Sequence, residues 1–125
     1  MSDPAAPTAE SLRQGRCVPC EGGVPKLSGA EIAQRIAVLD GWEARKDGEI
    51  DVIAKSWNAG DFVTALSFFN QVGELAEAED HHPNLHLTGY RHAEVELSTH
   101  AIGGLSENDF ILAAKIDALE APGSE

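Results

Sequence analysis

A run of alternating side chains over residues 92–100 restricts the possible folds of this chain more than any other feature. Apolar or small residues occupy every second position, and histidine, glutamate or serine occupies each position between them. Successive side chains of a β-strand point to opposite faces, so the pattern predicts a strand with one buried face and one polar face. The rest of the chain must therefore form the neighbouring strands and a layer that covers the apolar face. The predicted buried set is Ala93, Val95, Leu97 and Thr99, opposite His92, Glu94, Glu96, Ser98 and His100.

Two hairpins are predicted, and together they provide four strands. Asp-Gly at residues 47–48 separates two β-prone segments, 42–46 and 49–57, and this dipeptide is typical of a tight hairpin turn. Residues 85–88 and a turn near Gly89 precede the alternating run, which indicates the second hairpin. In the longer strand of the first hairpin, one buried face is expected to carry Ile50, Val52 and Ala54, opposite Asp51, Ile53 and Lys55.

Three helices are predicted from apolar residues at helical spacing and from capping sequences. The first covers residues 29–39 and starts with a capping box, in which the side chains of Ser28 and Glu31 each accept a backbone N–H. The second covers residues 61–79 and is the longest of the three. The third extends over residues 106–119, again behind a box-like cap.

The predicted elements follow the order αββαββα, without an internal repeat. This order indicates an α+β two-layer sandwich, in which three helices cover one face of a four-stranded antiparallel sheet. The 125 residues suit a single domain. We expect a flexible N-terminal extension over residues 1–26, the folded domain over residues 27–120 and a disordered tail over residues 121–125.

The charge and hydropathy of the chain exclude some partners. Nine basic residues against twenty-one acidic ones give a formal net charge of -12. Such a surface repels phosphate backbones and anionic lipid, so we expect no nucleic-acid partner. No apolar run reaches the length of a membrane span, and the N-terminus lacks the pattern of a signal peptide. We therefore expect a soluble cytoplasmic protein.

Three of the five histidines lie in two short segments at the ends of predicted elements. His81 and His82 end the second helix, because Pro83 prevents its continuation. The partial negative charge of a helix C-terminus favours imidazolium there, which suits a general acid. Glu77 lies one helical turn before His81 and is expected to orient its ring. His100 ends the alternating strand and could serve as the opposing base, so the pair suits an elimination or addition of water.

The same histidines are also compatible with roles outside proton transfer. Adjacent histidines at a helix end can simply compensate the helix dipole, and His86 and His92 are interpreted as ordinary surface or core residues. Three imidazoles and Glu77 could in principle bind zinc. The His-His dipeptide, however, lacks the i, i+4 geometry of helical zinc ligands, so no metal site is predicted.

Three motifs of this chain resemble those of the pterin-4a-carbinolamine dehydratase family over roughly residues 27–119. They are Glu77-Ala-Glu-Asp-His-His-Pro83, Val95-Glu-Leu-Ser-Thr-His100 and Gly104-Leu-Ser-Glu-Asn-Asp109. The resemblance implies the αββαββα fold, a homodimer or tetramer, and no metal or bound cofactor. It also implies dehydration of 4a-hydroxytetrahydrobiopterin, a small-molecule pterin, to quinonoid dihydropterin, which recycles the cofactor of aromatic amino acid hydroxylases.

The resemblance also implies roles for individual residues. His82 and His100 are assigned to the two proton transfers, and His81 to binding of the pterin and its hydroxyl. Asp109 has a competing role in the cap of its helix. The remaining residues implied to support the site or contact the substrate are Glu77, Pro83 and Thr99.

The chain departs from the family pattern at three places. Asn84 and Leu85 stand where members often carry an acidic residue and an aromatic one, and the 82–100 interval is one residue longer than in animal members. The N-terminal Cys17-Val-Pro-Cys20-Glu-Gly-Gly resembles a bacterial and plant branch, in which the cysteines could pack structurally or serve a redox or partner-linked role. Some carboxysome-associated members of that branch resemble RuBisCO assembly factors. The alternative function is therefore a non-catalytic chaperone that binds the RuBisCO large subunit.

Overall fold

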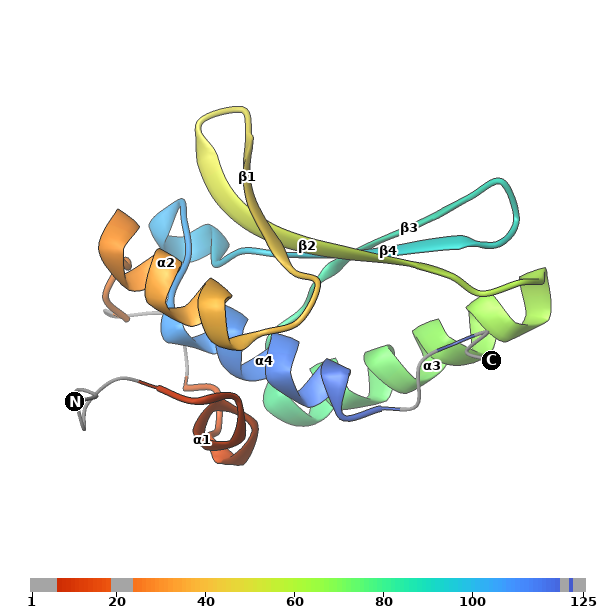
Figure 1. Ribbon diagram of the computed structural model, residues 1–125, viewed down its shortest axis with the longest axis horizontal. Helices are drawn as coiled ribbons and strands as arrows, with labels where there is room; N and C mark the ends of the chain where they lie inside the picture. The colour runs from red at the N-terminus through yellow and green to blue at the C-terminus, as the bar shows by residue number, and fades with distance from the viewer. Residues whose placement is uncertain (1–6, 19–23, 120–121, 123–125) are drawn as a thin grey trace.

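A computed structural model describes residues 7–18, 24–119 and 122 of the chain. Its helices and sheet form two layers, with a long twisted sheet on one side and the helices beneath it (Figure 1). In chain order the elements are α1 (Ala9–Gln14), α2 (Gly29–Val38), β1 (Glu43–Asp47), β2 (Ile50–Asn58), α3 (Phe62–Glu79), β3 (Asn84–Thr88), β4 (His92–Leu97), the 3₁₀ helix η1 (His100–Ile102) and α4 (Glu107–Asp117). The predicted tail and Cys20 lie outside the described residues, apart from residue 122.

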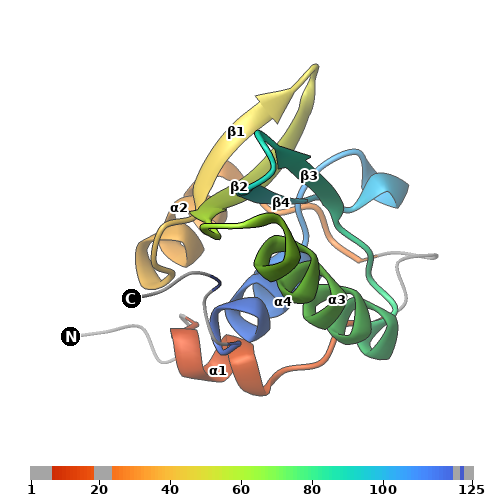
Figure 2. The ribbon, with the colours of Figure 1, turned by 90° about the vertical axis from the view of Figure 1, so that its right-hand side faces the viewer.

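The four strands form one antiparallel sheet in the order β1-β2-β4-β3. This arrangement confirms the predicted α+β fold and both predicted hairpins. Gly48 and Gly89 have positive φ angles of 66° and 53° in the two turns, a conformation that glycine adopts without steric cost. Figure 2 shows α3 and α4 lying side by side under the sheet, with α1 on the far side of α4.

The alternation along β4 is confirmed. Ala93, Val95 and Leu97 are fully buried and belong to the central apolar cluster. That cluster includes Phe68 and Val72 of α3, so β4 packs its apolar face on the helical layer. The strand thus provides the centre of the core, as a central strand with one buried face requires.

The predicted orientation of β2 is wrong. Its register pairs Ile53 with Leu97 and Trp57 with Ala93, and directly paired residues share a face of the sheet. Ile53 therefore faces the helices, and the expected core residues Val52 and Ala54 point to the opposite face. Both positions are still buried, at 2% and 1% exposure, because long side chains lie beside them: the register pairs Val52 with Arg45 and Ala54 with Glu96.

The helix boundaries follow the predicted capping sequences closely. Ser28 caps α2 through the expected capping box with Glu31, and Ser106 caps α4 through a box with Asp109. Asp61 caps α3 by accepting a hydrogen bond from the Thr64 backbone N–H at 2.8 Å. None of the described helices is long and apolar enough to cross a membrane.

A helix occupies part of the segment that composition predicts as a flexible extension. Thr8 and Ser11 form a capping box at the start of α1, and Leu12 is only 2% exposed. The helix packs against α4. A six-residue helix with a single buried apolar residue produces no periodic pattern, so its sequence does not reveal it.

Candidate active site

One shallow pocket brings together the three histidines that the sequence singles out. It has a volume of about 220 Å³ and lies between the end of α3 and the start of η1. Two segments that are distant in the sequence therefore meet at one site. Its lining residues are Asp80, His81, His82, Ser98, His100 and Ala101.

The end of α3 determines where the first two histidines point. Asp80 adopts a left-handed conformation, with φ of 55° and ψ of 41°, and its N–H donates to the carbonyl oxygens of Ala76 and Glu77. The N–H of His81 also donates to the Ala76 carbonyl oxygen, at 3.1 Å. This C-cap turns the chain sharply, and His81 and His82 leave the helix in different directions.

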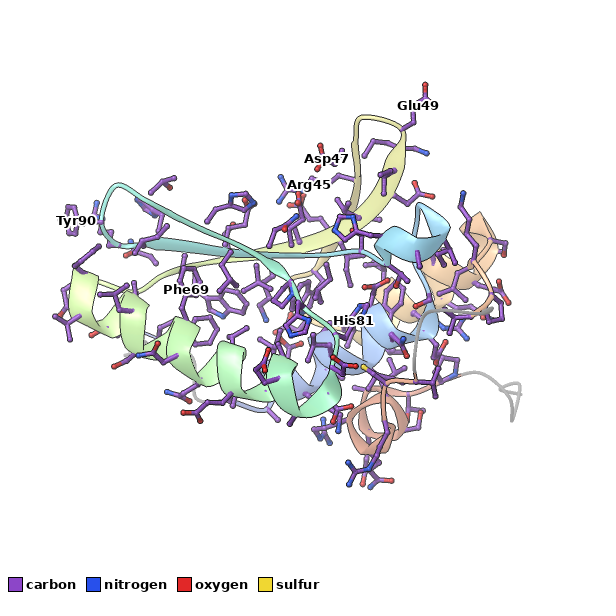
Figure 3. All side chains as sticks on the ribbon, turned by 180° about the vertical axis from the view of Figure 1, so that it is seen from behind. Arg45, Asp47, Glu49, Phe69, His81 and Tyr90 are labelled. Carbon is purple, nitrogen blue, oxygen red and sulfur yellow. The ribbon has the colours of Figure 1, made fainter. Side chains whose placement is uncertain are left out.

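His81 points inward and is fixed by a buried carboxylate. Its side chain lies between the sheet and the helices, where it is 5% exposed (Figure 3). Its Nε2 lies 2.7 Å from Oδ1 of Asp109, which is fully buried in the first turn of α4. The other carboxylate oxygen, Oδ2, accepts hydrogen bonds from the Thr99 hydroxyl at 2.8 Å and from the Ser106 N–H at 3.0 Å.

This arrangement gives Asp109 two roles at once. The sequence presents the helix cap and the site as competing roles, but each uses a different carboxylate oxygen. When the carboxylate is ionised, Oδ1 can only accept, so His81 then donates from Nε2. Asp109 thereby fixes both the orientation of the ring and its tautomer.

Glu77 contacts His82, not His81 as the helical spacing suggests. Its Oε2 lies 2.6 Å from Nε2 of His82. The reason is the left-handed Asp80, which ends the helix before His81 and turns His82 back toward the preceding turn. The two side chains are 77% and 56% exposed, so this pair contributes little to stability, about 0–1 kcal/mol.

His100 begins η1 and is exposed at the opposite edge of the pocket. Thr99, its predecessor, is 1% exposed and lies behind the pocket wall, where its hydroxyl contacts Asp109 and the Ser106 hydroxyl. Thr99 is therefore a buried supporting residue. Ser106 is a further member of this network; the sequence marks it as a cap, but only the fold brings it near His81.

A second, larger groove adjoins the histidine pocket. Its volume is about 590 Å³, and His82 belongs to the walls of both. Pro83 lines it just before β3 and Leu85 from within that strand, while Ala76 and Glu77 line it from α3. The combined site therefore offers imidazoles at one end and a largely apolar wall beside them.

The two remaining histidines lie on the open face of the sheet, outside both pockets. His92 pairs in register with Asn58 and Thr88, and His86 lies 4.0 Å from a carboxylate oxygen of Glu96. Among the described residues, no group of three or more His, Cys, Asp or Glu side chains is arranged to hold a metal ion.

Comparison with known proteins places this chain beside one enzyme family. Residues 25–119 match the family described as "Pterin 4 alpha carbinolamine dehydratase". A protein of Halorhodospira halophila that is named for the same dehydratase is 48% identical over 111 residues, which cover 89% of this chain and 99% of the relative.

Two solved structures share the fold. A crystal structure titled as a transcriptional coactivator/pterin dehydratase from Brucella melitensis has a TM-score of 0.66 and 34% identity, and the match covers 75% of this chain and 97% of that one. A pterin dehydratase-like protein identified as a RuBisCO assembly factor in the alpha-carboxysome has a TM-score of 0.50 and 22% identity, with 62% and 87% coverage. At that identity the second likeness shows a common fold only.

Proposed function

The chain belongs to the pterin 4 alpha carbinolamine dehydratase family, and we propose that it is an active hydro-lyase acting on 4a-hydroxytetrahydrobiopterin. One observation carries this proposal: three imidazoles meet in one pocket, and the innermost of them is held by a buried carboxylate. The burial of Asp109 also serves the cap of α4, so the support for catalysis comes from its second oxygen, which holds His81 at the pocket. The product would be quinonoid dihydropterin, which places the protein in tetrahydrobiopterin recycling.

The proposed reaction needs two proton transfers at one substrate. One imidazole donates a proton to the departing 4a-hydroxyl, which leaves as water when its bond to carbon breaks. A second imidazole removes a proton from the ring nitrogen, and the electron pair left there forms the new carbon–nitrogen double bond. His82 and His100 suit these transfers, because both are exposed and lie on the pocket wall.

His81 suits a different task. Its Nε2 is engaged by Asp109, and its ring is almost fully buried, so it is held in one orientation. A fixed ring positions the substrate hydroxyl between the two exposed imidazoles. The apolar wall beside the pocket, formed by Ala76, Pro83 and Leu85, would receive the flat pterin ring.

The test is to mix the protein with chemically generated 4a-hydroxytetrahydrobiopterin and follow its dehydration spectroscopically. The wild type is expected to accelerate the reaction, and the double variant His82→Ala, His100→Ala should lose at least about a hundredfold of this acceleration. His86→Ala is the matched control, because it removes an exposed histidine outside both pockets. The proposal fails if the wild type gives no acceleration or if the double variant retains it.

We further propose that the protein is a cytoplasmic homodimer. In the described sheet, β1 and β3 are edge strands with unpaired backbone groups, and such an edge can pair with a second copy. Light scattering after size exclusion measures the molar mass directly. A single 13.3 kDa species at micromolar concentration would contradict the dimer.

The same kinetic assay distinguishes the dehydratase from the alternative function, a RuBisCO assembly chaperone. This alternative predicts no acceleration by the wild type and direct binding to the RuBisCO large subunit. The fold likeness alone does not favour it over catalysis, since it says nothing about the pocket.

A further inference from the structure

The segment that follows α1 crosses the place where the end of α3 meets the start of α4. We call this segment, residues 15–18, the strap. The N–H of Cys17 donates to Oε1 of Glu79 at 2.9 Å, and the N–H of Val18 donates to Oδ1 of Asn108 at 3.0 Å. The side-chain amide of Asn108 returns a hydrogen bond to the Val18 carbonyl oxygen at 2.8 Å. The strap is therefore bonded to both helices through its backbone.

Both anchors are sequence neighbours of the buried pair in the site. Glu79 is the last residue of α3 and lies two positions before His81. Asn108 directly precedes Asp109 in the first turn of α4 and is 1% exposed. A displacement at either anchor moves one member of the pair relative to the other, and a hydrogen bond of 2.7 Å tolerates little displacement.

The ionised form of the Glu79 carboxylate at this junction depends on the strap. The Glu79 side chain is 7% exposed, and Lys115 Nζ approaches its Oε2 at 3.6 Å. Burial alone would raise the pKa of Glu79, but the Cys17 backbone hydrogen bond and the charge of Lys115 together hold it below its usual value. Lys115 also donates to the Arg13 carbonyl oxygen at 2.9 Å, so it ties α4 to the same extension.

We propose that the strap holds these two helix ends together and thereby sets the geometry of the His81–Asp109 pair. Glu79 and Asn108 are then positioning residues for the reaction, although neither lines the histidine pocket. The kinetic part of this inference rests on the proposed dehydratase function. The structural part does not, because the state of the strap and of the pair can be measured without substrate.

Cys17 reports whether the strap is docked. Its thiol is half-buried, and burial together with the neighbouring Glu79 carboxylate raises its pKa to about 12. Since the thiolate is the reactive form, docked Cys17 should alkylate very slowly at pH 8. A released strap would return the thiol toward its ordinary pKa near 9.0 and accelerate alkylation at least about tenfold. The Cys20→Ser background removes the other thiol from the measurement.

The first variant is Asn108→Ala, which removes both side-chain hydrogen bonds to Val18. Glu79→Ala removes the acceptor of the Cys17 N–H, whereas Glu79→Gln retains an acceptor oxygen and should restore part of the function. Leu12→Ala is a third way to release the strap. It leaves both anchors unchanged, because it removes only the buried side chain through which α1 packs. It keeps the test valid if an anchor variant does not fold.

Phe69→Ala is the control for a general loss of stability. Phe69 is partly buried near the middle of α3, away from His81 (Figure 3). We expect Asn108→Ala and Glu79→Ala to lower kcat about tenfold or more with KM changed less than about threefold, since misplacing a site group weakens the chemical step. Phe69→Ala should reduce thermal stability comparably without this change in kcat.

The His81 ring resonances in NMR spectra provide the readout that a purely structural role would not move. They should shift in the variants that release Cys17 and remain in place in Phe69→Ala. Faster Cys17 alkylation with unchanged His81 resonances and unchanged kcat would overturn the inference and leave the dehydratase function intact. Shifted resonances in a protein whose wild type shows no dehydratase activity would support the strap and reject the function.

Discussion

At the scale of single residues, Asp109 is the group on which the site depends most. Its two oxygens form hydrogen bonds with a histidine after α3, a threonine after β4 and the backbone at the start of its own helix. Satisfied buried networks of this kind are rigid, but the loss of one member leaves several polar groups without partners in an apolar interior. The same side chain therefore contributes to stability and to the geometry of the reaction.

Asp109→Ala should accordingly reduce both the stability of the protein and its activity. We expect the free energy of unfolding to fall by about 3 kcal/mol, because three buried donors lose their acceptor, and activity to fall at least about tenfold. Urea unfolding and the dehydration assay measure these changes. Asp51→Ala is the control: its partly exposed carboxylate pairs with exposed Lys46, so its cost should stay within about 0.5 kcal/mol. Equal costs for the two variants would contradict the central role of Asp109.

At the scale of elements, β2 shows that alternation alone does not select the buried face. Both of its alternating sets contain isoleucine, so the pattern is consistent with either orientation. Pairing with β4 decides between them, because Ile53 must lie beside Leu97 on the face that the helices cover. Val52 and Ala54 of the opposite set are buried as well, but beneath polar side chains of the open face.

The two isoleucines of β2 provide a direct test of this orientation. Ile53→Ala should cost about 2–5 kcal/mol, since Ile53 is fully buried in the apolar cluster. Ile50→Ala should cost less than about 1.5 kcal/mol, because Ile50 is only half-buried at the hairpin end. Chemical unfolding of both variants measures the difference. A larger cost at Ile50 would restore the orientation that the sequence pattern suggests.

At the scale of the whole molecule, carboxylates in separate elements link stability to pH. Backbone hydrogen bonds at the caps of α2 and α3 lower the pKa values of Glu31 and Asp61. At the strap, burial works against ionisation of Glu79, yet the Cys17 N–H and Lys115 lower its pKa below 4.5. A lowered folded-state pKa stabilises the fold above the unfolded pKa, and this stabilisation is lost as pH falls through the folded-state pKa.

Acid should therefore destabilise the protein through these groups. The urea midpoint is expected to be constant from well above pH 4.5 up to neutral pH and to fall as the pH drops below 4.5. Glu79→Gln removes one titrating carboxylate, so its midpoint should be lower at neutral pH but should fall less on acidification. A variant that loses stability as steeply as the wild type would show that Glu79 contributes nothing to this dependence.

The sequence by itself determined the parts of this protein that depend on local interactions. Capping boxes at Ser28 and Ser106, the turn at Gly48 and the alternation along β4 all act within a few residues. Their physical causes are therefore readable in the chain. The fold class and the candidate histidines followed from these signals and from the motif resemblance.

Only the tertiary structure decided which groups meet. The partner of His81 is Asp109 and not Glu77, because a left-handed residue ends α3 and redirects the following side chains. Which face of β2 packs on the helices, and where α1 packs, likewise depend on contacts between segments that are distant in the sequence. Such contacts are selected by the packing of the whole chain, and no local spacing encodes them.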